Sequence, residues 1–234
     1  MSTFLAEVLG TATLVLFGDG VVAGVSLNKS KSKDGGWMVI TMAWAMGVAV
    51  AAWIFGPISG GHFNPALTIA LAAIGNFSWS LVPSYIAGQM LGGILGAVIV
   101  WLAYLAHWKE TDNKAAKLGV FCTAPAIRNV GANLITEIIG TFLLVFGILG
   151  LGQIKMADGF SPFTVGILIL ILGLSYGGPT GYAINPARDL GPRIAHAILP
   201  IAGKGDSDWG YSWIPVVGPI IGALLGGLLF TLVF

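Results

Sequence analysis

The stretch Gly181-Tyr182-Ala183-Ile184-Asn185-Pro186-Ala187-Arg188-Asp189 decides the fold, because a related stretch, Gly61-His62-Phe63-Asn64-Pro65-Ala66, stands far upstream. In both, an Asn-Pro-Ala follows a glycine-containing loop and begins a short apolar run. Asparagine is a preferred N-cap, and proline is tolerated in the first helical turn. Each motif therefore predicts the start of a helix, over residues 64–74 and 185–198.

Both predicted helices are too short to cross a bilayer, which takes roughly 20 residues. A single Asn-Pro pair would fit an ordinary helix cap in a loop about as well as anything more specific. Two of them, one in each half of a membrane chain, are typical of half-helices whose polar loops line a cavity instead of facing lipid. The pair therefore predicts two re-entrant half-helices.

Composition places the rest of the chain in a membrane. The sequence has 234 residues, of which 56% are hydrophobic and 9% are charged, against roughly 25% charged in soluble domains. The net charge of +1 gives no indication of a nucleic-acid partner. Cys122 is the only cysteine, so no intramolecular disulfide can form. We expect no metal and no cofactor, because Cys/His clusters with metal-ligand spacing and phosphate-binding glycine loops are absent.

Six apolar stretches are long enough to span the membrane. The second is expected to stop at Gly56-Pro57, since glycine and proline end helices. The N-terminus lacks the features of a cleaved secretory signal, so we expect the first stretch to act as an uncleaved insertion signal. The fold class is thus an all-α membrane protein with six transmembrane helices and two half-helices, with spans at about residues 3–27, 37–56, 82–107, 131–152, 162–177 and 211–234.

The two halves of the sequence repeat. Glu7-x-x-Gly10-Thr11 recurs as Glu137-x-x-Gly140-Thr141, and a Gly-x-x-x-Gly ladder that begins at Gly88 recurs at Gly218; both offsets are 130 (137 − 7 and 218 − 88). Three spans repeated once give an inverted second copy, with the working site near the midplane. We expect a first repeat at 1–108, a connecting loop at 109–129 and a second repeat at 130–234. The ladders pack helices within a protomer or between protomers, and we favour the former.

These features together resemble the aquaporin, or major intrinsic protein, family over essentially the whole chain. Asp189 directly after Arg188 is similar to the glycerol-facilitator (aquaglyceroporin) branch. The resemblance implies a passive channel and no enzyme, a homotetramer with one pore per protomer, and both termini in the cytoplasm. The positive-inside rule favours the opposite orientation, because the links 28–36 and 108–129 hold most of the basic residues. From the small size and short tails we expect a bacterial plasma membrane.

The chemistry of the paired motifs agrees with a pore for neutral solutes. Two half-helices would meet at their N-termini, each of which carries about half a positive charge, and would oppose protons and cations. The amides of Asn64 and Asn185 would donate to a permeating hydroxyl group. That hydroxyl would donate in turn to carbonyls of the two loops, Gly60, Gly61, His62, Phe63, Gly181, Tyr182, Ala183 and Ile184.

The resemblance also implies a selectivity filter made of Trp44, Gly173, Tyr182 and Arg188. Glycerol facilitators typically have Trp, Gly, Phe and Arg there, so Tyr182 departs from the pattern. Gly173, where water-selective members usually have His, is expected to leave room. Trp44 and Tyr182 would contact a carbon backbone, while the permanently charged Arg188 would bind hydroxyl groups and repel cations.

Alternatives to a glycerol and water channel remain open. The Tyr182 hydroxyl could narrow the filter and shift preference towards water, dihydroxyacetone, urea or lactic acid. A proton-coupled transporter also uses inverted repeats and broken helices, but His62 is the only titratable candidate for coupling. A membrane enzyme is disfavoured, because no nucleophile–base constellation stands out.

Several other polar residues have specific expected roles. In the family, the counterparts of Glu7 and Glu137 brace the re-entrant loops by accepting backbone N–H bonds, which we favour over a proton relay. Asp189 is expected to form a local salt bridge or to cap the start of its half-helix. His62 either lines the pore or braces its loop. Asp19 is expected near the membrane interface, beside Lys29 or Lys31, with a gate in the vestibule as the alternative.

Overall fold

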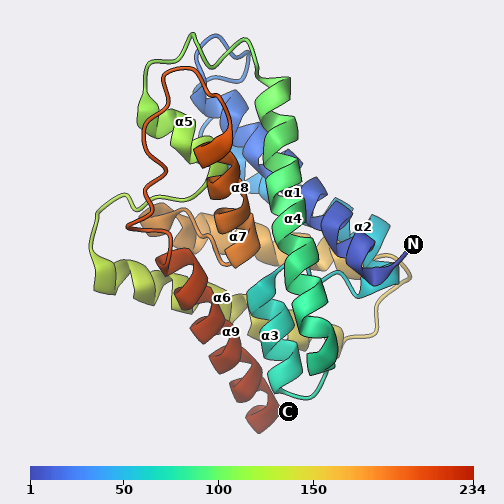
Figure 1. Cartoon of the computed structure of the whole chain (residues 1–234). Helices are drawn as coiled ribbons and strands as arrows, with labels where there is room; N and C mark the ends of the chain where they lie inside the picture. The colour runs from blue at the N-terminus through green and yellow to red at the C-terminus, as the bar shows by residue number, and fades with distance from the viewer.

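The computed structural model describes all 234 residues and contains helices but no strands (Figure 1). Six helices are long and apolar enough to cross a membrane. Three others, α3, α5 and α8, are short. This confirms the expected all-α membrane fold with two short re-entrant helices. The elements are α1 (Thr3–Ser26), α2 (Trp37–Ser59), α3 (Pro65–Ala73), α4 (Val82–Ala103, preceded by the 3-10 turn Trp79–Leu81), α5 (Lys114–Phe121), α6 (Val130–Gly152), α7 (Ser161–Thr180), α8 (Pro186–Ile198) and α9 (Ile214–Val233).

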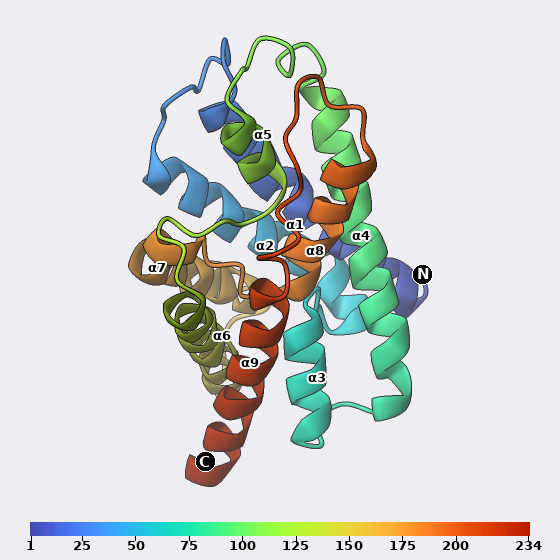
Figure 2. The ribbon, with the colours of Figure 1, turned by 60° about the vertical axis from the view of Figure 1, so that its left-hand side comes forward.

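The two half-helices begin where the Asn-Pro motifs predict. The Asn64 side chain accepts a hydrogen bond from the Ala66 N–H, and Asn185 accepts from the N–H groups of Ala187 and Arg188. A proline follows each cap as the first helical residue, where its missing N–H removes no bond. Helices α3 and α8 both begin near the middle of the bundle, and they extend from there towards opposite ends of the molecule (Figure 2).

Some helix boundaries differ from the prediction. Helix α2 continues through Pro57 and α7 through Pro179, and each ends one residue before a left-handed glycine, Gly60 (φ 87°) or Gly181 (φ 81°). A proline near the end of a helix removes one N–H without stopping the turn, whereas a glycine at positive φ ends it. Helix α4 ends at Ala103 rather than 107, and α9 begins at Ile214 rather than 211 because Pro215 sets its first turn.

The glycine ladders pack helices within the protomer. Helix α4 lies against α1, and α9 against α6, as the most extensive helix pairs of the fold. A Cβ atom on Gly92 would lie 2.3 Å from the Val8 carbonyl oxygen, and one on Gly222 would lie 2.2 Å from that of Ile138. Only glycine permits backbones to approach this closely.

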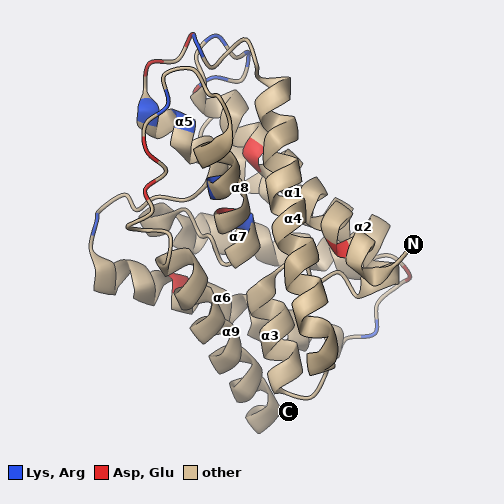
Figure 3. Cartoon of the chain, in the orientation of Figure 1, with Lys and Arg blue, Asp and Glu red and all other residues tan.

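Charge is distributed unevenly along the molecule. Helices α4 and α9 contain no charged residue, and most charged residues lie at the end that holds α5 (Figure 3). Helix α5 itself was not expected, since the whole segment 109–129 was predicted as a loop. Its N-cap is Asn113, whose side chain accepts from the Ala116 N–H, and it covers the end of the bundle where α8 lies.

Candidate pore

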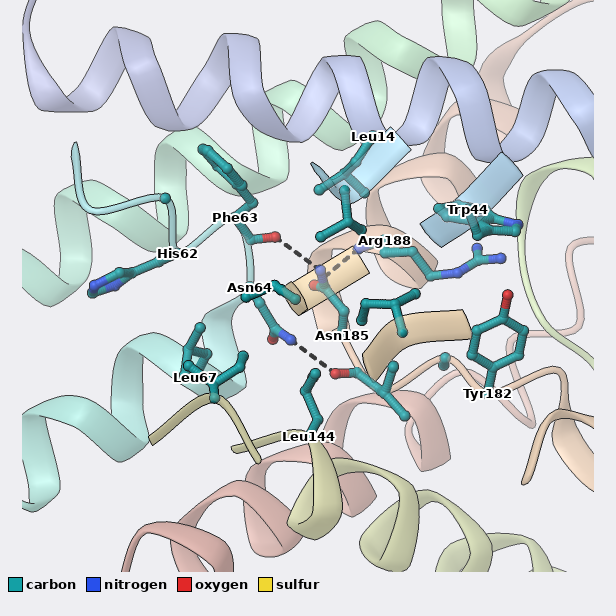
Figure 4. Close-up of a pocket in the computed structure, with 17 residues that line it drawn as sticks. Leu14, Trp44, His62, Phe63, Asn64, Leu67, Leu144, Tyr182, Asn185 and Arg188 are labelled. Carbon is teal, nitrogen blue, oxygen red and sulfur yellow. Dashed lines mark hydrogen bonds between the residues drawn. The ribbon is translucent and has the colours of Figure 1, made fainter. Parts of the chain in front are cut away.

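The N-termini of α3 and α8 meet through crossed hydrogen bonds. The Asn64 Nδ2 donates to the Ile184 carbonyl at 2.8 Å, and the Asn185 Nδ2 donates to the Phe63 carbonyl at 2.8 Å (Figure 4). An amide has two N–H groups, so each asparagine keeps one for another acceptor. The sequence predicted both amides as donors to a solute, but it did not predict that each also binds the opposite loop.

The two loops have unusual backbone conformations. Phe63, Tyr182 and Ile184 have φ values of 49°, 39° and 43°, in the left-handed region that side chains with a Cβ seldom adopt. Such conformations persist only where the surroundings fix them.

Two buried carboxylates hold these conformations. Glu7, which is 0% exposed, accepts from the N–H groups of His62 (3.2 Å) and Phe63 (2.7 Å), and also from Ser59 and Gln89. Charge-assisted hydrogen bonds of this kind are stronger than neutral ones.

The second loop has its own carboxylate. Glu137, which is 1% exposed, accepts from the N–H groups of Ala183 (3.0 Å) and Ile184 (2.9 Å). With both N–H groups occupied, the loop has few alternative conformations, and its carbonyl groups point away from the carboxylate. Glu7 and Glu137 thus make the contacts that bracing requires.

Three cavities follow one another through the bundle. A narrow central cavity of about 70 Å³ is lined by Asn64, Asn185 and mainly apolar side chains. It shares His62 and Gly61, among others, with a wider cavity of about 540 Å³ that reaches the α6–α7 link. On the other side it shares Trp44, Tyr182 and Arg188 with a cavity of about 190 Å³ that reaches the segment after α5.

Two of the three residues at that second junction, Arg188 and Trp44, are in direct contact. The Arg188 Cζ lies 3.9 Å from the centroid of the Trp44 ring (Figure 4), within the range of a cation–π contact. The Tyr182 ring packs edge-on to Trp37 at 5.9 Å, and its buried hydroxyl has no hydrogen-bond partner. An aromatic pair and a guanidinium therefore surround the passage on one side of the asparagines.

Gly173 lies directly behind the ring of Tyr182. It lines none of the three cavities, and a Cβ atom on it would lie 2.8 Å from Tyr182 Cζ. Gly177, one turn further, faces the same ring. The space that Gly173 leaves is therefore filled by the Tyr182 ring and does not widen the passage directly.

Asp189 forms the local salt bridge that was one of its two expected roles. It binds Arg193 at 2.8 Å and accepts from the Thr123 N–H (2.7 Å) and hydroxyl (2.6 Å). Arg193 in turn donates to the Thr123 carbonyl and to carbonyls of the loop after α8. This buried cluster fixes α8 to the segment 109–129. Asp189 and Arg193 are one helical turn apart, whereas nothing in the sequence indicated the contact with Thr123.

His62 combines its two expected roles. Its Nδ1 lies 3.1 Å from the Thr68 hydroxyl, which ties the first loop to α3. The residue also lines both the central and the wider cavity.

The expectation for Asp19 was wrong. It is 0% exposed, and the nearest basic group is Arg188, not Lys29 or Lys31; Lys29 pairs with Glu110 at 2.5 Å. Asp19 points into the bundle, towards Arg188 of α8, which its position in the sequence did not reveal.

Six spanning helices, two half-helices joined at their N-termini and a series of cavities between the two ends define a helical membrane channel. A family model described as major intrinsic protein matches residues 1–230. The chain belongs to the major intrinsic protein family.

Similar proteins include both sequences and a solved structure. The chain is 62% identical to the "Probable glycerol uptake facilitator protein" of Thermotoga maritima, over 94% of each chain. It is 60% identical to the "Glycerol uptake facilitator protein" of Bacillus subtilis, over 94% of this chain and 80% of that one. The aquaglyceroporin from Plasmodium falciparum superimposes with a TM-score of 0.87 at 28% identity, covering 98% of this chain and 95% of that chain.

Proposed function

We propose that the protein is a passive channel for glycerol and similar small uncharged solutes, with water. The observation that carries this proposal is the junction of two cavities on one side of the paired asparagines. Both cavities are lined there by Trp44, Tyr182 and Arg188. The names of the bacterial relatives support glycerol as the main solute. No step of the proposed transport needs a titratable coupling group, since Asn64 and Asn185 stay neutral.

Trp44, Tyr182 and Arg188 act as the selectivity filter in this proposal, with Gly173 supporting the Tyr182 ring from behind. The aromatic faces contact the carbon backbone of glycerol, and the guanidinium donates to its hydroxyl groups. A solute without apolar surface loses the first interaction, and one without hydroxyl or carbonyl groups loses the second. A cation is repelled by the permanent positive charge of Arg188.

At the asparagines, the remaining N–H of each amide donates to the solute. Loop carbonyls such as that of His62 or Ala183 accept from it, so that a hydroxyl group exchanges partners as it advances. The two half-helix N-termini keep the potential positive there, which opposes protons and cations. The apolar wall, which includes Leu67 and Leu144, binds no hydroxyl group and keeps the solute moving.

We further infer an inverted repeat of 1–108 and 130–234, joined by the loop 109–129, and a homotetramer with one pore in each protomer. Both termini and the α6–α7 link lie in the cytoplasm in this arrangement, and α5 lies outside. The membrane is the bacterial plasma membrane, in keeping with the Thermotoga and Bacillus relatives.

Stopped-flow light scattering on proteoliposomes tests the function. Vesicles are shrunk with an impermeant osmolyte and then exposed to glycerol, urea or, at low pH, lactic acid, with protein-free vesicles as the control. Fast re-swelling in glycerol, with a linear dependence on its concentration, is expected. Fast water flux without glycerol entry would identify a water channel, and flux that depends on a proton gradient would identify a coupled transporter.

A further inference from the structure

Asp19 is a buried acid that the proposed transport steps do not use. It lies on α1 between Gly18 and Gly20, and neither carboxylate oxygen has a hydrogen-bond partner. Its Oδ1 is 3.8 Å from the Arg188 NH1, which also lacks a hydrogen-bond partner. Buried ionised groups are costly unless they are paired, so the carboxylate and the guanidinium each offset the cost of burying the other's charge.

The local sequence brings α1 close enough for this pair to form. A Cβ atom on Gly18 would lie 2.2 Å from the Trp44 ring, so the glycine lets that ring lie directly against α1. The same ring faces the Arg188 guanidinium at 3.9 Å. Trp44 and Asp19 are thus the two neighbours that can hold the guanidinium, which donates no hydrogen bond within the protein.

The surrounding charges sum to zero. The charged groups that act on Asp19 are Arg188, with opposite sign, and Asp189, with the same sign. Asp189 is already paired with Arg193 at 2.8 Å. The buried set is therefore two acids and two arginines, and removing the charge of Asp19 would leave Arg188 as an uncompensated cation beside the passage.

We propose that Asp19 is the counter-ion and a positioning residue of Arg188. It draws NH1 away from the passage, so that the other guanidinium nitrogens face the solute. It also offsets the attraction of the guanidinium for small anions, so that they are not retained where neutral solutes must pass. Arg188 lines both cavities at this junction and Asp19 lines neither, so the guanidinium still repels a cation in the passage. This inference rests on the proposed function, because it assigns a role within the same pore.

The variant Asp19→Asn keeps the shape of the side chain and removes its charge. Glycerol flux into proteoliposomes is measured in sodium nitrate and in sodium gluconate, whose anion is too large to enter. We expect nitrate to leave the wild type unchanged and to slow the variant several-fold, because an uncompensated Arg188 attracts the small anion. The matched control is Asp112→Asn, an exposed acid at the same end of the molecule, which should behave as the wild type.

A double-mutant cycle with Arg188→Gln gives a readout independent of transport. Losses in Tm in detergent should be smaller for the double variant than the sum of the two single losses, since the double variant leaves no charge unpaired. Nitrate-insensitive flux in Asp19→Asn, or additive losses, would overturn the proposal.

If Asp19→Asn does not fold, recovery of a folded protein in the double variant supports the pairing, and failure of the double variant overturns it. A wild type that admits no glycerol would overturn the proposed function instead, and the cycle would still report on the pair.

Discussion

Asn64 and Asn185 each donate a hydrogen bond to the carbonyl of the residue that immediately precedes the other: Asn64 to Ile184, and Asn185 to Phe63, both at 2.8 Å. The arrangement is reciprocal, so each asparagine caps its own half-helix and fixes the loop of the other. One side chain therefore serves a local and a long-range contact at once.

Replacing Asn64 with Ala should cost more than an ordinary helix cap. The cap contributes about 1 kcal/mol, and the Ile184 carbonyl would lose its partner in a buried site, which adds about 1–3 kcal/mol. Thermal unfolding in detergent measures the loss. The control is Asn113→Ala, which removes the cap of α5 but no bond to a distant loop; equal losses in the two variants would contradict the expectation.

Glu137→Gln should disturb the second loop. The carboxylate accepts from two backbone N–H groups, of Ala183 and Ile184, whereas an amide has only one acceptor and would turn N–H groups towards one of these donors. We expect a loss of about 1.5–3 kcal/mol and a several-fold loss of glycerol and water flux. Glu110→Gln, at an exposed ion pair, is the comparison and should change little; a Glu137 variant with wild-type Tm and flux would rule out the brace.

Tyr182→Phe tests the filter residue that departs from the glycerol-facilitator pattern. Its hydroxyl is buried without a partner and its ring lines the passage, so its removal should cost little stability and raise glycerol flux relative to water by a few-fold. Tyr211→Phe is a matched control, since that hydroxyl is also buried and unpartnered but the residue lines none of the three cavities. Unchanged ratios among glycerol, water and urea would show that the hydroxyl plays no part in selection.

Gly173→Ala should reduce flux through its neighbour. The new methyl group would lie 2.8 Å from Tyr182 Cζ, well inside the normal carbon–carbon contact distance of about 3.5–4.0 Å. It would therefore push the ring towards the passage. We expect slower entry of both glycerol and water. Gly178→Ala lies on the same helix with no atom within 4 Å of the added carbon and should not alter flux. If the two alanine variants transported equally well, the ring would not be supported as described.

Orientation can be read by labelling single cysteines. Cys122 is buried and is replaced by serine. In intact bacteria, a membrane-impermeant maleimide should then label Asp112→Cys and leave Asp158→Cys unlabelled, because α5 is proposed to lie outside. The reverse pattern would place α5 in the cytoplasm, as the positive-inside rule favours.

Local signals in the sequence predicted every helix except α5, but they did not predict the contacts between distant segments. The Asn-Pro caps predicted both half-helix starts because the cap and the helix are neighbours in the chain. The sequence predicted that α2 ends at Pro57, because proline is a common helix terminator. The helix instead ends at the left-handed Gly60, a conformation that the sequence does not reveal.

The environments of Asp19 and Gly173 depend on which side chain of another helix occupies the adjoining space. For Asp19 this is Arg188 from α8, and for Gly173 it is the ring of Tyr182. A single sequence carries no direct information on such neighbours, since residues far apart in the chain meet only after the helices have packed. The family resemblance supplied the filter positions but not the packing behind them.

The crossed asparagine bonds also bear on the rate of transport. Carriers that rock between two states take microseconds to milliseconds for each collective step, and such rocking would have to separate the α3 and α8 loops and break both bonds in every cycle. With the two halves tied together at their midpoint, the protein has no such cycle to complete. Solute then crosses at a rate set by its own diffusion and its concentration gradient, and throughput rises with concentration without the ceiling that a moving carrier imposes.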